Sequence, residues 1–272
     1  MIHAGLIGEV LGHSQSPVIH QKLWKALGLS GTYDLIEIPR AEFRPHVEAL
    51  FGKLDGFNVT IPYKTDVIPF LTDLSPEAEK IGAVNTVAVS GALRKGFNTD
   101  YIGFARTVER IGAVPKGKSA AVLGTGGAAR AIIQCLADLG AARLLVVSRH
   151  PEAVDDEFKT FAAARGARLI SYETLAREEG YLLVNCTPCG MYPKTDAMPV
   201  AEATARSYEK VIDIIYNPKE THLLRAAREG GADTANGMYM LVGQAAAAEE
   251  IWLGRTIGPD IVEQVAKEME GY

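Results

Sequence analysis

Ser119–Ala131 reads SAAVLGTGGAARA, and this stretch decides the fold. Its first five residues are small or apolar, as is typical of a short buried strand. A turn with the pattern G-x-G-x-x-A follows, and apolar residues then recur at helical spacing from Ala131 to Leu139. A glycine turn between a strand and a helix predicts a dinucleotide-binding unit of the Rossmann type. The alternative is a strand–helix corner that binds no ligand.

Each small residue of this turn has a physical role in such a unit. Gly124 permits the tight turn, Gly126 lets the backbone approach a pyrophosphate, and Ala129 lets the helix pack closely on the strand. The free N–H groups at the start of the helix then face the phosphates. The residues of the turn that we expect to bind the cofactor are Gly124, Thr125, Gly126, Gly127 and Ala128.

The next predicted strand, Arg143–Val147, indicates which cofactor is bound. A site for NAD places an Asp or Glu on the ribose 2′-hydroxyl about twenty residues after the turn. Here the strand is followed by Ser148, Arg149 and His150, none of which is a carboxylate. An arginine fork matches the oxygens of a 2′-phosphate, so Ser148 and Arg149 favour NADP(H). The alternative is an ordinary surface arginine at the end of a strand.

Composition limits the classes of protein to consider. A chain of 272 residues allows one large or two modest domains, and its net charge of −5 predicts no general affinity for nucleic acid. We find no run of eighteen apolar residues and no signal-peptide pattern, so we expect no membrane span. Three cysteines do not make a disulfide framework, which predicts the cytoplasm. Metal-ligand spacings are absent, and we expect no metal.

The whole chain alternates strands and helices until residue 237. The expected strands are Ile2–Ile7, Thr32–Ile38, Gly56–Ile61, Val84–Val89, Leu93–Phe97, Ser119–Leu123, Arg143–Val147, Ala167–Ile170, Tyr181–Asn185 and Lys210–Ile214. The expected helices before the glycine turn are Pro17–Leu27, Ala41–Phe51, Ser75–Gly82 and Tyr101–Ile111, and two helices, Met238–Leu253 and Pro259–Glu268, end the chain. The pattern after the turn predicts a doubly wound parallel sheet. The fold class is therefore α/β.

Two serines bracket the predicted start of the first helix, at Pro17. Ser14 and Ser16 place hydroxyl groups beside free backbone N–H groups and the positive end of the helix dipole. Such an arrangement binds anions and would suit a carboxylate. The simpler interpretation is that Ser16 only caps the helix, and the sequence pattern leaves both open.

A lysine and an aspartate occupy the ends of two elements. Lys64 follows the strand that Pro62 ends, at the edge where open α/β sheets bind ligands. Asp100 precedes the helix that begins at Tyr101. A Lys–Asp pair could transfer a proton beside a hydride acceptor. The alternatives are a surface lysine and an aspartate that caps its helix.

Two further features are less specific. Gln244 lies on the apolar face of its predicted helix, so its amide needs a hydrogen-bond partner, either the backbone or a substrate hydroxyl. Cys186 and Cys189 form a CxxC pattern, but a redox or metal interpretation needs a thioredoxin-like start or a second pair of ligands. We instead interpret the stretch from Thr187 to Met191 as a loop that faces the nicotinamide end of the cofactor.

Taken together, these motifs resemble the shikimate dehydrogenase family over essentially the whole chain. The matching stretches are GHSQSP, NVTIPYK, GAVNT, NTD, GTGGAARA, NCTPCGM, DIIYNPKET and NGMYMLVGQ. The resemblance implies the NADPH-dependent, reversible reduction of 3-dehydroshikimate to shikimate in the biosynthesis of aromatic amino acids. It also implies a substrate domain at 1–101, completed by helices of 238–272 that return to it, and an NADP-binding Rossmann domain at 102–237.

The same resemblance assigns residues to roles. Lys64, paired with Asp100, would be the acid/base group. The residues that would bind substrate are Ser14, Ser16 and Tyr216 for the carboxylate, and Thr60, Asn85, Asp100 and Gln244 for the ring hydroxyls. The cofactor would be bound by the glycine turn, by Ser148 and Arg149, and also by Thr187, Ile214 and Gly237.

Two other functions remain to be distinguished. A sister enzyme would oxidise quinate, with NAD or with both cofactors. A non-catalytic NADP-binding sensor would keep the glycine turn without needing Lys64 and Asp100. We expect a small-molecule substrate, no nucleic acid or membrane partner, and a monomer or homodimer.

Overall fold

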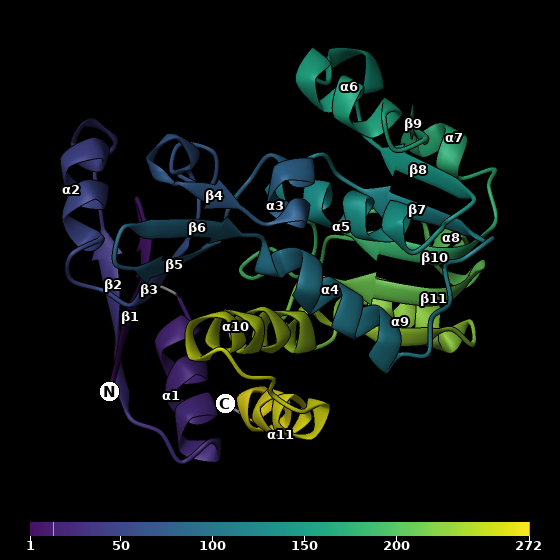
Figure 1. Cartoon of the computed structure of the whole chain (residues 1–272). Coiled ribbons are helices and arrows are strands. Elements are labelled where there is room, and N and C mark those ends of the chain that lie inside the picture. Colours follow the sequence, from purple (N-terminus) through teal and green to yellow (C-terminus); the bar gives the residue numbers. More distant parts are fainter. Residues whose placement is uncertain (13, 272) are drawn as a thin grey trace. The chain divides into compact units, whose positions relative to one another are not determined.

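The computed structural model describes residues 1–12 and 14–271, so His13 of the serine motif and Tyr272 lie outside the described residues. The chain divides into two compact units (Figure 1). Unit 1 contains Met1–Gly103 and Val242–Tyr272, and unit 2 contains Phe104–Leu241. The sequence predicted a substrate domain at 1–101 completed by 238–272, which corresponds to unit 1, and a cofactor domain at 102–237, which corresponds to unit 2. Within the described residues, no helix has both the length and the apolar character to cross a membrane.

Unit 1 is built on a mixed six-stranded sheet with the order β2-β1-β3-β5-β6-β4. Its strands are β1 (Ile2–Gly8), β2 (Gly31–Glu37), β3 (Gly56–Val59), β4 (Asp73–Leu74), β5 (Thr86–Ser90) and β6 (Leu93–Phe97). β1 pairs in parallel with β2 and β3, while β5 and β6 form the predicted antiparallel hairpin. Ile7, Phe57 and Val87 are fully buried at its centre.

The helices of unit 1 carry several predicted site residues. They are α1 (Ser16–Ala26), α2 (Phe43–Leu50), α3 (Pro76–Ile81) and α11 (Pro259–Glu270), with short 3-10 turns at Arg40–Glu42 and Ile68–Phe70. Helix α1 contacts α11 (Figure 1). Two longer helices, α4 (Thr99–Arg110) and α10 (Gly237–Leu253), each contribute residues to both units.

The interpretation of Ser16 as a helix cap is wrong. Helix α1 begins at Ser16 itself, and the capping position is Gln15, whose side chain makes no capping bond. Pro17 still lies in the first turn, where its missing N–H has no intrahelical acceptor to lose. Ser75, by contrast, is a true cap, because its hydroxyl accepts from the Ala78 N–H at 3.2 Å.

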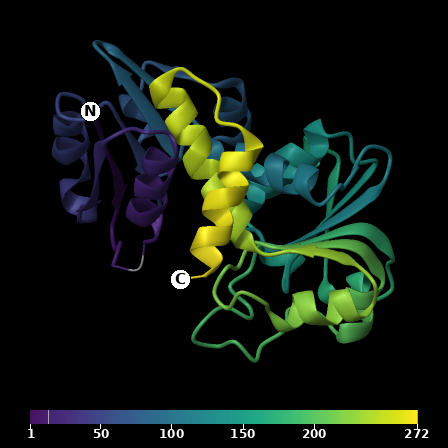
Figure 2. The ribbon, with the colours of Figure 1, turned by 90° about the horizontal axis from the view of Figure 1, so that it is seen from below.

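Unit 2 is the predicted parallel sheet, with the order β12-β11-β10-β7-β8-β9. Its strands are β7 (Ser119–Leu123), β8 (Arg143–Val147), β9 (Ala167–Ile170), β10 (Gly180–Asn185), β11 (Tyr208–Asp213) and β12 (Asp233–Ala235). Its further helices are α5 (Gly127–Asp138), α6 (Asp156–Ala163), α7 (Tyr172–Leu175), α8 (Glu202–Arg206) and α9 (His222–Glu229), with a 3-10 turn at Pro151–Ala153. Figure 2 shows helices on both faces of this sheet. Strand order reverses at β7, as in doubly wound nucleotide-binding folds.

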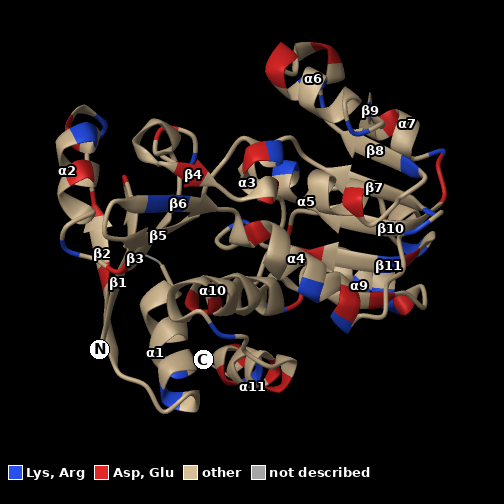
Figure 3. Ribbon diagram, in the orientation of Figure 1, with Lys and Arg blue, Asp and Glu red and all other residues tan. Residues whose placement is uncertain are grey.

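Burial in unit 2 follows from its topology. Val122, Val146, Leu183 and Val211 are fully buried on four neighbouring strands, because helices cover both faces of a parallel sheet. Charged residues lie mainly on the helices and loops, and both signs mix along helices such as α9 (Figure 3). Strands β7, β8, β10 and β11 are parallel, so the loops that follow their carboxyl ends all lie at the same edge of the sheet.

Candidate active site and cofactor site

Lys64 and Asp100 lie together in unit 1. The Lys64 Nζ donates to Asp100 Oδ2 at 2.6 Å, and their side chains are 21% and 8% exposed. Lys64 sits on the turn after β3, and its carbonyl accepts from the Val84 N–H at 2.7 Å. Asp100 occupies the first turn of α4, where Asn98 Oδ1 accepts from the Tyr101 N–H at 3.2 Å. Asn98 is thus the cap of this helix, and the interpretation of Asp100 as its cap is wrong.

The chemistry of the pair follows from its geometry. A lysine ammonium has three donors, so bonding Asp100 leaves others available for a ligand oxygen. Partial burial lowers the local dielectric constant and strengthens the attraction between the two groups. The carboxylate therefore orients the ammonium, and the ammonium can give a proton to an oxygen on which negative charge develops.

Asn85 connects this pair to helix α10. Its buried side chain accepts through Oδ1 from the Thr99 N–H at 2.6 Å and from the Thr99 hydroxyl at 3.1 Å. Its Nδ2 donates to Gln244 Oε1 at 3.2 Å. Thr99 directly precedes Asp100, so one hydrogen-bonded group holds Asn85, Gln244 and the backbone beside Asp100 in fixed relative positions.

Three more predicted substrate residues lie in the same unit. Thr60 directly follows β3, and its N–H donates to the Ile7 carbonyl at 2.9 Å. Ser14 and Ser16 lie at the amino end of α1, where Ser14 Oγ accepts from the Ser16 N–H at 3.3 Å. All three side chains are half-buried and so retain access to solvent.

The glycine turn of unit 2 has the form that a pyrophosphate needs. Gly124 has φ +102°, a conformation that favours glycine, and its N–H donates to the Val147 carbonyl at 2.9 Å. Helix α5 starts at Gly127, and its capping residue Gly126 provides no side chain. A Cβ added at Gly126 or Gly127 would meet no atom within 4 Å, so open space lies over the helix start. These residues fit a bound phosphate group.

The end of β8 carries the residues that favour NADP(H). Ser148 is half-buried and its hydroxyl accepts from the His150 N–H at 3.2 Å, while Arg149 is exposed. Among residues 1–12 and 14–271, the Arg149 guanidinium forms no ion pair. The nearby Glu152 carboxylate lies 3.4 Å from His150 Nδ1. The guanidinium of Arg149 is thus available to a 2′-phosphate.

A buried polar network at the ends of β10 and β11 was missed by the sequence analysis. Asp213 is fully buried and accepts from Thr221 Oγ1 at 2.7 Å, Asn185 Nδ2 at 3.0 Å and the Ile215 N–H at 3.1 Å. Burial raises the pKa of Asp213 to about 6, although these donors lower it. Asn185 Oδ1 in turn accepts from the Thr187 hydroxyl at 2.7 Å. The sequence did contain one signal of this network, because the neighbouring strands β10 and β11 end in the polar residues Asn185 and Asp213.

This network positions the loops that carry Thr187 and Ile214. Thr187 packs beside the glycine turn, because a Cβ on Gly124 would lie 3.0 Å from its Cγ2. A Cβ on Gly237 would lie 1.9 Å from the Ile214 carbonyl oxygen, so only glycine permits that approach. In the structure, Gly124 therefore lies next to Thr187, and Gly237 lies next to Ile214. Tyr216 is half-buried in the same unit, and burial raises its pKa.

The CxxC residues, Cys186 and Cys189, are half-buried thiols. Burial raises the pKa of Cys186 and of Cys189, which disfavours the thiolate that redox and metal chemistry require. Both cysteines are free. Among the described residues, no group of three His, Cys, Asp or Glu could hold a metal ion.

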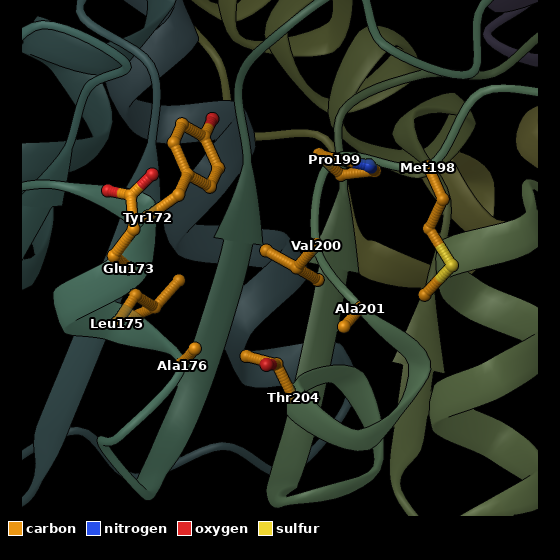
Figure 4. A pocket seen from close by; sticks show the side chains of 9 residues that line it. All are labelled: Tyr172, Glu173, Leu175, Ala176, Met198, Pro199, Val200, Ala201 and Thr204. Atoms are coloured by element: carbon orange, nitrogen blue, oxygen red, sulfur yellow. The ribbon is translucent and has the colours of Figure 1, made fainter.

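One pocket of unit 2 lies outside every predicted site. It has a volume of about 450 Å³ and opens between α7 and the segment before α8 (Figure 4). Its lining is mainly apolar, with Leu175, Met198 and Val200 among its residues. Burial raises the pKa of Tyr172 on its wall, and the charge of Arg149 acts in the opposite direction. None of the predicted site residues lines this pocket.

Comparison with sequence families gives two matches. The profile of the Shikimate dehydrogenase substrate binding domain matches residues 6–87, and that of the Shikimate 5'-dehydrogenase C-terminal domain matches residues 237–267. The Shikimate dehydrogenase (NADP(+)) of Clostridium perfringens is 42% identical over 269 residues, which cover 98% of this chain and 97% of that protein.

Solved structures agree with the sequence matches. A chorismate mutase/shikimate 5-dehydrogenase fusion protein from Clostridium acetobutylicum superposes with a TM-score of 0.93 at 43% identity, covering 100% of this chain and 98% of that one. Shikimate 5-dehydrogenase from Thermus thermophilus, in complex with NADP(H) and shikimate, gives a TM-score of 0.87 at 31% identity and covers 98% of this chain and 99% of that one.

Proposed function

Because the chain belongs to the shikimate dehydrogenase family, we propose that it interconverts shikimate and 3-dehydroshikimate, with NADP(H) as the second substrate. The observation that carries this proposal is the Lys64–Asp100 pair, joined at 2.6 Å in the unit that the substrate-binding profile matches. A protein that only senses NADP would have no use for a partly buried proton donor of this kind. The reaction belongs to the biosynthesis of aromatic amino acids.

The residues of unit 2 would hold the cofactor. The N–H groups of the glycine turn would bind the pyrophosphate, Ser148 and Arg149 the 2′-phosphate, and the Thr187 loop, with Ile214 and Gly237, would line the nicotinamide end. When bound, NADP(H) supplies or accepts the hydride. The exposed guanidinium of Arg149 and the open space over Gly126 support this assignment.

The residues of unit 1 would hold the substrate. Ser14 and Ser16, helped by Tyr216 of unit 2, would bind its carboxylate. Thr60, Asn85, Asp100 and Gln244 would bind its ring hydroxyls. In the reduction, Lys64 gives its proton to the carbonyl oxygen as negative charge develops there, and Asp100 orients the ammonium. In the oxidation of shikimate, the neutral amine takes the hydroxyl proton.

Two properties outside the reaction complete the proposal. Three free cysteines support a reducing compartment, and we propose the cytoplasm. A monomer or a homodimer is proposed for the assembly, and sedimentation equilibrium measures it directly.

Substitution of Lys64 tests the proposed site. Lys64→Ala should lower kcat for shikimate oxidation by about 10²–10⁴-fold, because a positioned acid/base group contributes that much. KM for shikimate should change far less. Lys95→Ala is the matched control, since Lys95 is an ion-paired lysine of the same unit, 2.7 Å from Asp73. Wild-type kcat in Lys64→Ala would remove this lysine from the mechanism, and a wild-type protein that turns over no shikimate would refute the function itself.

A further inference from the structure

Thr86, a fully buried residue of β5, lies at the centre of a group of hydrogen bonds in unit 1. The register of the sheet places it directly opposite Asn58 of β3, so the two side chains lie on the same face. Asn58 Nδ2 donates to Thr86 Oγ1 at 2.9 Å and to the Asn85 carbonyl at 3.2 Å. A carbonyl can only accept, so the nitrogen of the Asn58 amide must lie on this side. Asn58 Oδ1, on the other side, accepts from the Tyr33 hydroxyl at 2.7 Å.

The hydroxyl groups of Thr86 and Thr99 both reach the side-chain oxygen of Asn85. Thr86 Oγ1 lies 3.0 Å from Thr99 Oγ1, and these two oxygens lie 3.2 Å and 3.1 Å from Asn85 Oδ1. Whichever hydroxyl donates to the other, the remaining proton goes to Asn85 Oδ1. The Thr99 N–H donates to the same oxygen at 2.6 Å. Both threonines are fully buried, so water does not compete for these bonds.

These donors determine which way the Asn85 amide faces. A backbone N–H can only donate, so the Asn85 atom that it contacts must be the oxygen, and the amide nitrogen lies on the other side. Asn85 Nδ2 donates to Gln244 Oε1 at 3.2 Å, and this bond in turn orients the Gln244 amide, with its nitrogen away from Asn85. The donors that these two amides can offer to a ligand are therefore the second hydrogen of Asn85 Nδ2 and the hydrogens of Gln244 Nε2.

We propose that Thr86 is a positioning residue, which acts through Asn85 to present amide N–H groups, and not amide oxygens, to the substrate. The inference rests on the proposed function, in which Asn85 and Gln244 bind ring hydroxyls. A hydroxyl that accepts from an amide keeps its own proton for an acceptor, and the Asp100 carboxylate of the same unit provides one. In that function Lys64 serves the oxygen that reacts, so Asn85 bonds a hydroxyl that does not react.

Removal of the Thr86 hydroxyl tests the proposal. Thr86→Val keeps the size of the side chain and should raise KM for shikimate about 3- to 10-fold, the effect of one lost hydrogen bond. It should change kcat less than about twofold, because a bond to a hydroxyl that does not react is similar in the ground and transition states. KM for NADP⁺ should stay at the wild-type value. Thr86→Ser keeps the hydroxyl and should restore KM for shikimate, whereas a higher KM in Thr86→Ser than in Thr86→Val would indicate a packing role and overturn the inference.

Two comparisons separate this effect from a general loss of stability. Ser75→Ala is the matched control, since it removes another buried hydroxyl of unit 1, which caps α3 by accepting from the Ala78 N–H at 3.2 Å. It should lower the stability and leave both KM values unchanged. Circular dichroism verifies the fold of each variant before the kinetic measurements. If Thr86→Val does not fold, Thr86→Ala and Thr86→Ser differ only in the hydroxyl, and KM for shikimate should be higher in Thr86→Ala by the same factor.

A double variant distinguishes failure of this inference from failure of the proposed function. In the Asn85→Ala background, Thr86→Val should add little to the increase in KM, because Thr86 acts through Asn85. Increases that multiply, or a wild-type KM in Thr86→Val when Asn85→Ala raises it, would overturn the inference and leave the proposed function intact. A wild-type KM in Asn85→Ala would refute the assignment of Asn85 to the substrate, and the inference with it. A wild-type protein that turns over no shikimate would refute the proposed function itself.

Discussion

Asp213 makes the stability of unit 2 depend on pH. Burial raises its pKa from 3.8 to about 6, against the lowering effect of its three donors. A raised pKa means that the folded protein binds the proton more tightly than the unfolded chain does. The stabilisation that Asp213 contributes is therefore fully present below pH 3.8 and is lost as the pH rises through about 6.

Asp213→Asn should remove this contribution. Between about pH 4 and about pH 7, the free energy of unfolding of the wild type should fall by roughly 1–3 kcal/mol relative to that of the variant. Urea denaturation of both proteins at several pH values measures the difference. Two curves that run parallel across this range would contradict the assignment, whatever their vertical offset.

Arg149 determines the preference for NADP⁺ over NAD⁺ in this account. Its guanidinium is exposed, and Glu152 lies beside His150, so Arg149→Ala removes a group that is available to a phosphate. Loss of one charge-assisted bond, worth about 1.5–3 kcal/mol, should raise KM for NADP⁺ roughly ten- to a hundred-fold. KM for NAD⁺ should hardly change, because NAD⁺ has no 2′-phosphate.

Kinetics with both cofactors decide the role of Arg149. Arg168→Ala is the control, since it removes another exposed arginine of the same sheet, one that lies 3.6 Å from Glu178. Equal losses with NADP⁺ and NAD⁺ in Arg149→Ala would mean that this residue supports the fold or contacts the adenosine part instead.

At the residue scale, the sequence identified groups that follow a strand end or a helix start, such as Lys64 and Arg149. It missed Tyr33, Asn58 and Asp213 as members of polar networks. Tyr33 and Asn58 lie inside predicted strands, where a tyrosine or an asparagine carries no distinctive spacing. The residues that they bond are distant in the sequence: Tyr33 and Asn58 are 25 residues apart, and Asn58 and Thr86 are 28 residues apart. The periodicity of a sequence indicates only local structure. Contacts between distant residues depend on which strands become neighbours in the sheet, so periodicity does not predict them.

At the scale of elements, the His20–Glu249 pair joins α1 to α10. Glu249 Oε2 has no hydrogen-bond partner among the described residues, so His20 provides the main partner of this buried carboxylate. Breaking a buried pair by removing one partner costs about 3–5 kcal/mol, because the other charge is left unpaired. His20→Leu should therefore destabilise the protein by about that amount.

A double-mutant cycle tests this connection. His20→Leu/Glu249→Leu should recover much of the stability that His20→Leu loses, because no buried charge then remains. Lys22→Ala is the comparison for a surface pair, since Lys22 lies 3.0 Å from the half-exposed Glu268 of α11 and should cost about 0–1 kcal/mol. Strictly additive losses at positions 20 and 249, measured by chemical denaturation, would show that the two residues do not act as a pair.

Elements with strong periodicity were predicted well, and the weakest ones were missed. The hairpin of β5 and β6 and the parallel sheet through β7, β8 and β10 were predicted and are confirmed. The strands β4 and β12 were missed, because two and three residues give no measurable alternation. Helix α5 starts at Gly127 instead of Ala131, since glycine and alanine at its start carry no amphipathic signal.

At the scale of the molecule, each unit carries one group of the proposed site residues. Unit 1 holds the Lys64–Asp100 pair and the Asn85–Gln244 contact, and unit 2 holds the glycine turn and Arg149. The pattern of motifs predicted both groups, because each motif lies at the end of a regular element. What the sequence could not reveal is which side chains support those motifs, since that depends on packing between distant segments.

The most direct test of the whole account is the initial rate of formation of reduced nicotinamide, followed by its absorbance. Shikimate and quinate are each assayed with NADP⁺ and with NAD⁺. We predict the largest kcat/KM for shikimate with NADP⁺, and a moderate preference for NADP⁺, because Arg149 is followed by Pro151, Glu152 and Ala153 without a second cation. A larger kcat/KM for quinate, or no turnover of shikimate with either cofactor, would contradict the account.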